Sequence, residues 1–97
     1  MNHPPVLKSA ELEMALTDLP GWKVSGVAIQ KTFKSQSFME GISKMVEIAR
    51  LAEELDHHPD MFIHYRDVTF SCWTHVSGGV TAKDIDLAHR VERIWAG

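Results

Sequence analysis

Residues 37–59 read SFMEGISKMVEIARLAEELDHHP and predict a long amphipathic helix. Ser37 and Glu40 match a capping box, in which the serine hydroxyl accepts a hydrogen bond from a backbone N–H while the glutamate reaches back. The apolar residues that follow recur at a spacing of three and four and share one face: Phe38, Ile42, Met45, Ala49 and Ala52. Because Pro59 disfavours helical geometry in the residue before it, we expect the helix to end near His58.

The sequence before this helix predicts a loose arm, a short helix and a hairpin. Residues 1–8 hold two prolines and show no periodicity, so we expect a loose N-terminal arm. From Ser9, the expected N-cap, leucines recur at helical spacing until Pro20-Gly21 ends the helix. Residues 22–33 alternate between apolar and polar side chains around the turn signal Ser25-Gly26, which predicts a hairpin.

The sequence after residue 59 predicts a second hairpin and a final helix. Residues 61–65 and 68–75 alternate as two strands around Arg66-Asp67. In the second strand, one face holds Val68, Phe70, Cys72 and Thr74, and the other holds Thr69, Ser71, Trp73 and His75. Residues 81–84 repeat the capping pattern and open a helix whose buried stripe is expected to hold Leu87, Val91 and Ile94.

The order helix, two strands, helix, two strands, helix indicates an α+β fold. We expect a two-layer sandwich with a four-stranded antiparallel sheet and three helices on one face. A chain of 97 residues allows one domain, residues 1–97, with a modest core. Additional burial through self-association is therefore expected.

Composition and charge exclude several classes of protein. The chain is 44% hydrophobic and 24% charged, which is typical of a globular domain and not of a disordered one. The net charge of −3 leaves no basic face for direct nucleic-acid binding. No apolar run exceeds three residues, so we expect no membrane span and no signal peptide, and hence a cytoplasmic protein.

Histidine is the residue type most suggestive of chemistry. Four of the six histidines, His57, His58, His64 and His75, fall within nineteen positions. A single histidine at a helix end is usually only a cation favoured by the helix dipole. The His57-His58 pair lies beside carboxylates and before a rigid proline. For this pair, a role in proton transfer and a merely favourable position at a helix end are about equally good interpretations.

The remaining histidines divide into one candidate and three surface residues. His75 ends a predicted strand just before a Gly-Gly loop and a helix start, a frequent position for a ligand contact. We expect His64 to be an exposed or partly exposed strand residue, and we expect His3 and His89 to lie at the surface.

Two other chemistries are weaker alternatives. Zinc could take nitrogen and oxygen ligands from His57, His58 and His75 with Asp56 or Glu53, but no His-Glu-x-x-His or His-x-His spacing supports it. Cys72 points away from His75 by strand alternation, so we expect a core residue and not a nucleophile. A lone cysteine also forms no internal disulfide.

Three segments resemble the pterin-4a-carbinolamine dehydratase family: residues 52–59 (AEELDHHP), Thr74-His75 and residues 79–88 (GVTAKDIDLA). Gly21-Trp22 also fits, so the likeness runs from about residue 10 to residue 95. The resemblance implies an α+β sandwich that forms dimers or tetramers and uses neither a metal nor an organic cofactor. It implies a lyase that removes water from a 4a-hydroxy-tetrahydropterin, giving quinonoid dihydropterin in tetrahydrobiopterin recycling.

The resemblance also implies the site residues. The pterin pocket would be lined by Asp56, His57, His58, Trp73, Thr74, His75 and Val76, with Glu53 and Asp84 in supporting positions. Of the three catalytic candidates we assign His57 and His75 to proton transfer and His58 mainly to binding. Some members of the family have Ser, Glu and Arg where this chain has Trp73, Val76 and Lys83, which bears on substrate preference and not on the reaction.

The resemblance implies two kinds of partner. The substrate is the product of aromatic amino acid hydroxylases, so a functional link to such an enzyme is expected. Animal members of the family also serve as dimerisation cofactors of a homeodomain transcription factor, and this non-enzymatic scaffold role is the alternative function. A scaffold would tolerate loss of its histidines, whereas this chain keeps all three.

Overall fold

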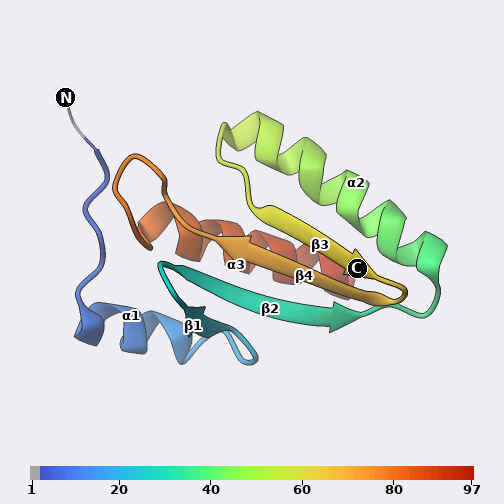
Figure 1. Ribbon diagram of the computed structural model, residues 1–97, viewed down its shortest axis with the longest axis horizontal. Helices are drawn as coiled ribbons and strands as arrows, with labels where there is room; N and C mark the ends of the chain where they lie inside the picture. Colours follow the sequence, from blue (N-terminus) through green and yellow to red (C-terminus); the bar gives the residue numbers. More distant parts are fainter. Residues whose placement is uncertain (1–2) are drawn as a thin grey trace.

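The computed structural model describes residues 3–97 and has the expected order of elements (Figure 1). The elements are α1 (Ser9–Leu16), β1 (Lys23–Ser25), β2 (Ala28–Lys34), α2 (Phe38–Leu55), β3 (Asp60–His64), β4 (Asp67–Cys72) and α3 (Ala82–Ala96). The predicted α+β class is confirmed. Of the helices in residues 3–97, none has the length and apolar character needed to cross a membrane.

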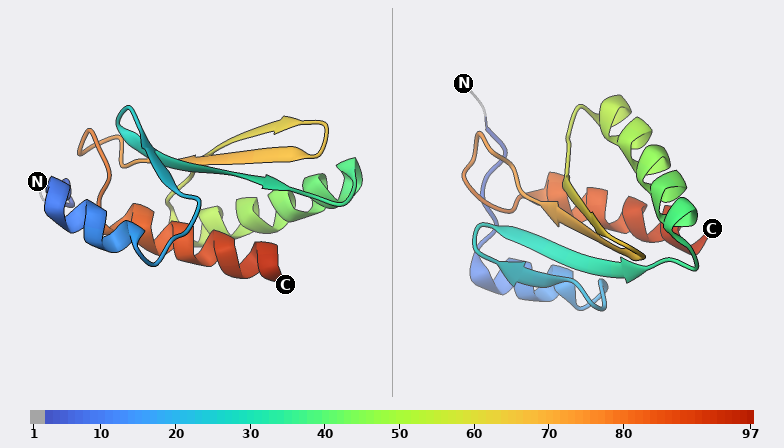
Figure 2. Two further views of the ribbon diagram at one scale, coloured as in Figure 1. Left: turned by 90° about the horizontal axis from the view of Figure 1, so that it is seen from below. Right: turned by 45° about the vertical axis from the view of Figure 1, so that its right-hand side comes forward.

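The four strands form one antiparallel sheet in the order β1-β2-β4-β3. The helices lie together on one face of this sheet, and the opposite face carries none of the helices α1–α3 (Figure 2). Ile29 of β2 is opposite Cys72 of β4, and Asp60 of β3 is opposite Ser71 of β4. The carboxyl end of β4 and the amino end of β3 therefore meet at the same end of the sheet.

Strand β4 supplies the centre of the core. Val68, Phe70 and Cys72 are fully buried beneath the helices, while Thr69 and Ser71 between them are only half-buried. The predicted alternation is therefore confirmed, and Cys72 is a core residue as expected. Burial raises the pKa of the Cys72 thiol far above its usual range, and nearby carboxylates raise it further, so the thiolate does not form at neutral pH.

Helix α2 begins as predicted but ends earlier. The Ser37 hydroxyl accepts a hydrogen bond from the Glu40 N–H at 3.0 Å, while the Glu40 carboxylate accepts from the Gln36 N–H and not from that of Ser37. The last helical residue is Leu55, three residues before the expected end, because Asp56 adopts a left-handed conformation with φ of 50°. His57 and His58 therefore lie in the connection to β3 and not in the last helical turn.

The second hairpin turns one residue earlier than predicted. His64 pairs with Asp67, so Tyr65 and Arg66 are the two turn residues, and Tyr65 has φ of 53°. Strand β4 ends at Cys72, and the chain then forms a loop in which Thr74 pairs with Gly79. The predicted strand over residues 68–75 is thus too long at its carboxyl end.

The N-terminal arm is held in place from Pro4 onwards, which corrects the expectation of a loose segment. The Leu7 N–H donates to the Val80 carbonyl at 2.9 Å, and the Ser77 hydroxyl donates to the Pro4 carbonyl. Met1 and Asn2, also part of the expected arm, lie outside the described residues. The first helix begins one residue earlier than expected, since its N-cap is Lys8 and not Ser9.

Candidate active site

A pocket of about 350 Å³ opens where the α2–β3 connection, the end of β4 and the start of α3 meet. The structure brings together at this pocket every residue predicted to contact substrate: Asp56, His57, His58, Trp73, Thr74, His75 and Val76. Lys83, in the first turn of α3, lines it as well. The family resemblance links Lys83 to substrate preference but does not include it among the predicted pocket residues.

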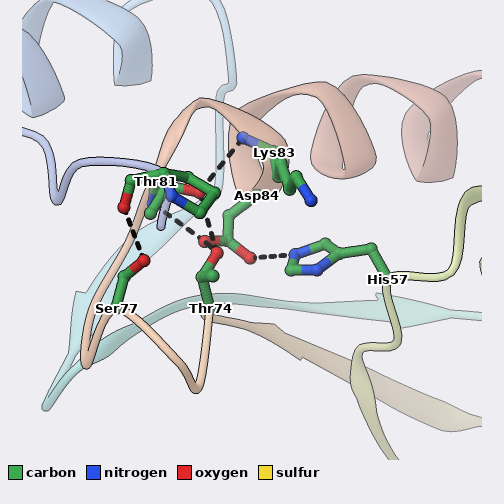
Figure 3. Close-up of polar contacts among 7 residues, drawn as sticks. His57, Thr74, Ser77, Thr81, Lys83 and Asp84 are labelled. Atoms are coloured by element: carbon green, nitrogen blue, oxygen red, sulfur yellow. Dashed lines mark hydrogen bonds and ion pairs between the residues drawn. The ribbon is translucent and has the colours of Figure 1, made fainter. Parts of the chain in front are cut away.

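Asp84 is the buried centre of the polar network beside this pocket (Figure 3). One carboxylate oxygen accepts hydrogen bonds from the Thr74 hydroxyl and the Thr81 N–H, both at 2.8 Å. The other lies 2.6 Å from Nε2 of His57. The predicted capping box at Thr81 is therefore confirmed, and its carboxylate also joins the end of β4, the start of α3 and the α2–β3 connection.

The Asp84 carboxylate holds the ring of His57 in place. Its side chain is only 13% exposed, and Nε2 is the atom that faces Asp84. A buried carboxylate accepts a hydrogen bond from an imidazole N–H, which fixes the orientation of the ring. This contact leaves Nδ1 as the other ring nitrogen of His57.

His58 has a different partner and is held more weakly. Its Nε2 contacts the carboxylate of Glu53, one turn back on α2, and both side chains are more than half exposed to solvent. An exposed pair of this kind is screened by water and contributes little to stability. The two adjacent histidines therefore contact separate carboxylates.

His75 reaches the pocket from the loop after β4. Its side chain is exposed, and its ring is stacked on the indole of Trp73 with 4.0 Å between the ring centroids and 29° between the planes. Trp73 and His75 lie on the side of the chain opposite Cys72 and Thr74, as alternation predicts.

The other histidines lie outside the pocket lining. His64 is exposed at the far end of β3, and His3 is exposed in the N-terminal arm, as expected. His89 is half-buried on α3, which is less exposed than predicted. Within residues 3–97, no three His, Cys, Asp or Glu side chains are grouped closely enough to hold a metal ion.

The fold and the pocket together define a small α+β domain whose site presents several imidazoles, one of them supported by a buried carboxylate, to a small molecule. Residues 5–94 match the family model of pterin 4 alpha carbinolamine dehydratase. The chain belongs to this family.

Curated relatives and a solved structure agree with this assignment. Proteins provisionally named pterin-4-alpha-carbinolamine dehydratase include one from Mycolicibacterium smegmatis, 42% identical over 92% of this chain and 95% of its own length. Another, from Roseiflexus castenholzii, is 47% identical over 92% of this chain and 96% of its own length. A crystal structure from Brucella melitensis, described as a transcriptional coactivator/pterin dehydratase, is 38% identical with a TM-score of 0.87 and covers 92% of this chain and 97% of that one.

Proposed function

We propose that the protein dehydrates a 4a-hydroxy-tetrahydropterin to quinonoid dihydropterin and water. The observation that carries this proposal is the pocket itself, where His57, His58 and His75 converge and a buried carboxylate supports His57. Membership in the pterin 4 alpha carbinolamine dehydratase family supports the same reaction.

The reaction needs two proton transfers and no redox step. The bond between C4a and the hydroxyl oxygen breaks, and the oxygen takes a proton and leaves as water. The N5–H proton departs to a base, and its bonding electrons form the N5–C4a double bond. A group that gives one proton and a group that takes the other therefore suffice, and imidazoles do both near neutral pH.

We assign the roles as the family resemblance implies, and the contacts of each side chain support this assignment. His57 and His75 move the two protons, and His58 mainly binds the pterin. The remaining walls are formed by Asp56, Trp73, Thr74, Val76 and Lys83. Asp84 and Glu53 hold His57 and His58. The proposed reaction requires no metal or organic cofactor, and its substrate comes from a hydroxylase that uses a tetrahydropterin to oxidise an aromatic amino acid.

The first test measures whether the purified protein accelerates loss of water from 4a-hydroxy-tetrahydropterin generated in situ, above the spontaneous rate. We expect full acceleration after prolonged treatment with a chelator and no further gain from added zinc. Activity that disappears with the chelator and returns with zinc would contradict the metal-free mechanism. A rate no faster than the spontaneous one would contradict the dehydratase proposal.

Self-association is the second part of the proposal. Strands β1 and β3 form the two edges of the sheet, and an open edge presents unpaired backbone groups that pair readily with another chain. We expect light scattering at micromolar concentration to give a dimer or tetramer of the 10.9 kDa chain. A mass equal to one chain across that concentration range would contradict this expectation.

A protein-binding scaffold is the alternative function. The Brucella melitensis protein is described as a transcriptional coactivator as well as a pterin dehydratase, which favours this candidate. A scaffold needs the surface of the domain and not its imidazoles. A folded protein that shows no dehydratase activity would therefore favour the scaffold.

A further inference from the structure

The three pocket histidines differ in what holds their rings. Nε2 of His57 meets the buried carboxylate of Asp84, and Nε2 of His58 meets the carboxylate of Glu53. Within residues 3–97, neither ring nitrogen of His75 forms a hydrogen bond or an ion pair. The ring of His75 lies instead against the indole of Trp73, 4.0 Å away and close to parallel.

The backbone on both sides of the stack is fixed. The Thr74 N–H donates to the Gly79 carbonyl at 2.9 Å, and the Gly78 N–H is shared between the carbonyls of Thr74 and His75. The Thr74 hydroxyl is tied to Asp84 beneath the loop. The stack itself places the rings of Trp73 and His75 on the same side of this segment. The indole therefore restricts a side chain that would otherwise turn freely in solvent.

We propose that Trp73 is a positioning residue for His75, a role that rests on the proposed dehydratase function. The indole holds the imidazole by its face and leaves both ring nitrogens to the bound molecule. A carboxylate, in contrast, occupies one nitrogen and fixes which of the two carries the hydrogen. His75 can thus donate from one nitrogen while accepting at the other, whereas His57 offers the substrate Nδ1 alone.

A different role for Trp73 is a flat wall on which the pterin ring stacks. A wall acts on binding and its effect does not depend on His75. A positioning residue acts through His75, so its effect on catalysis disappears when His75 is removed. The two roles are therefore separated by a double-mutant cycle.

The kinetic test compares Trp73→Leu and Trp73→Phe in the unchanged chain and in the His75→Ala background. The stack stabilises the position of the His75 ring, and its loss should raise the activation barrier accordingly. We therefore expect Trp73→Leu to lower kcat about tenfold, with a smaller change in KM. Trp73→Phe keeps a stacking face and should retain kcat within about threefold. In the His75→Ala background, both variants should match His75→Ala alone. Ser71→Ala, two residues earlier on the same side of β4, is the matched control and should leave kcat unchanged.

A second test does not need activity. The ring protons of His75, assigned by their loss in His75→Ala, should show an upfield ring-current shift in the NMR spectrum of the unaltered protein. This shift should vanish in Trp73→Leu and survive in part in Trp73→Phe. Ring protons at ordinary positions in the unaltered protein would contradict the stack. A tenfold loss of kcat in Trp73→Leu that persists in the His75→Ala background would contradict the positioning role while leaving the dehydratase function standing. If the unaltered protein has no dehydratase activity, the proposed function fails and the NMR test alone decides the stack.

Discussion

Replacing Asp84 with alanine is expected to cost the protein about 3 kcal/mol of unfolding free energy, because a buried carboxylate with three partners disappears. The side chain is fully buried and joins Thr74, Thr81 and His57. Without it, the Thr81 N–H at the start of α3 is left buried and unpaired. Urea denaturation followed by circular dichroism measures the loss.

Asp84→Asn separates the stability role from the catalytic one. Asparagine has nearly the same shape and keeps one oxygen acceptor, so we expect it to retain more of the stability than alanine does. It removes the negative charge facing Nε2 of His57, so kcat should still fall. The control is Asp86→Ala on the same helix, since Asp86 is exposed and pairs with Arg90 across one turn. We expect this change to alter stability by about 0.5 kcal/mol or less. Equal losses at Asp84 and Asp86 would contradict a central role for the buried carboxylate.

His57→Ala and His75→Ala are each expected to lower kcat about 100-fold, the usual contribution of a positioned proton donor or acceptor, with smaller changes in KM. His58→Ala should instead raise KM more than it lowers kcat, because its ring is supported by an exposed carboxylate and mainly binds the substrate. Steady-state kinetics with 4a-hydroxy-tetrahydropterin separate the two patterns.

His64→Ala and His89→Ala are the matched controls for the histidine series. Each removes one imidazole outside the pocket lining, so kcat and KM should stay near those of the unaltered protein. If His64→Ala abolishes activity while His75→Ala keeps most of it, the site lies at the other end of the second hairpin and the proposed pocket is wrong.

Most of the fold could be predicted because its signals are local. Ser37 and Thr81 cap their helices through residues three positions ahead, so the pattern and the contact lie in the same short segment. The burial of Val68, Phe70 and Cys72 follows from a period of two along a single strand. Neither feature depends on a distant part of the chain.

The incorrect boundaries have causes that no local pattern carries. Asp56 ends α2 by adopting a left-handed conformation, a role that glycine or asparagine would have signalled more clearly. Tyr65 likewise takes a positive φ in the turn, which is rare for an aromatic residue. The arm is held because Leu7 meets Val80 across 73 residues, and residues 1–8 contain no periodic pattern that would predict such a contact.

The candidate site was predictable in its members but not in its contacts. The resemblance identifies the residues that the structure gathers at the pocket, and alternation places Trp73 and His75 on one side. Asp84 and His57 are 27 residues apart in sequence. Their contact depends on how α3 packs against the α2–β3 connection, which no local pattern predicts. Lys83, which the resemblance linked only to substrate preference, also lines the pocket.

The most direct test of the central claim is a comparison of dehydration rates between the unaltered protein and the double variant His57→Ala/His75→Ala, both treated with a chelator. We expect the unaltered protein to accelerate loss of water from 4a-hydroxy-tetrahydropterin strongly. The double variant, shown to be folded by circular dichroism, should fall close to the spontaneous rate, although its loss need not equal the product of the single losses. A folded double variant that dehydrates the substrate as fast as the unaltered protein would contradict proton transfer by these two histidines.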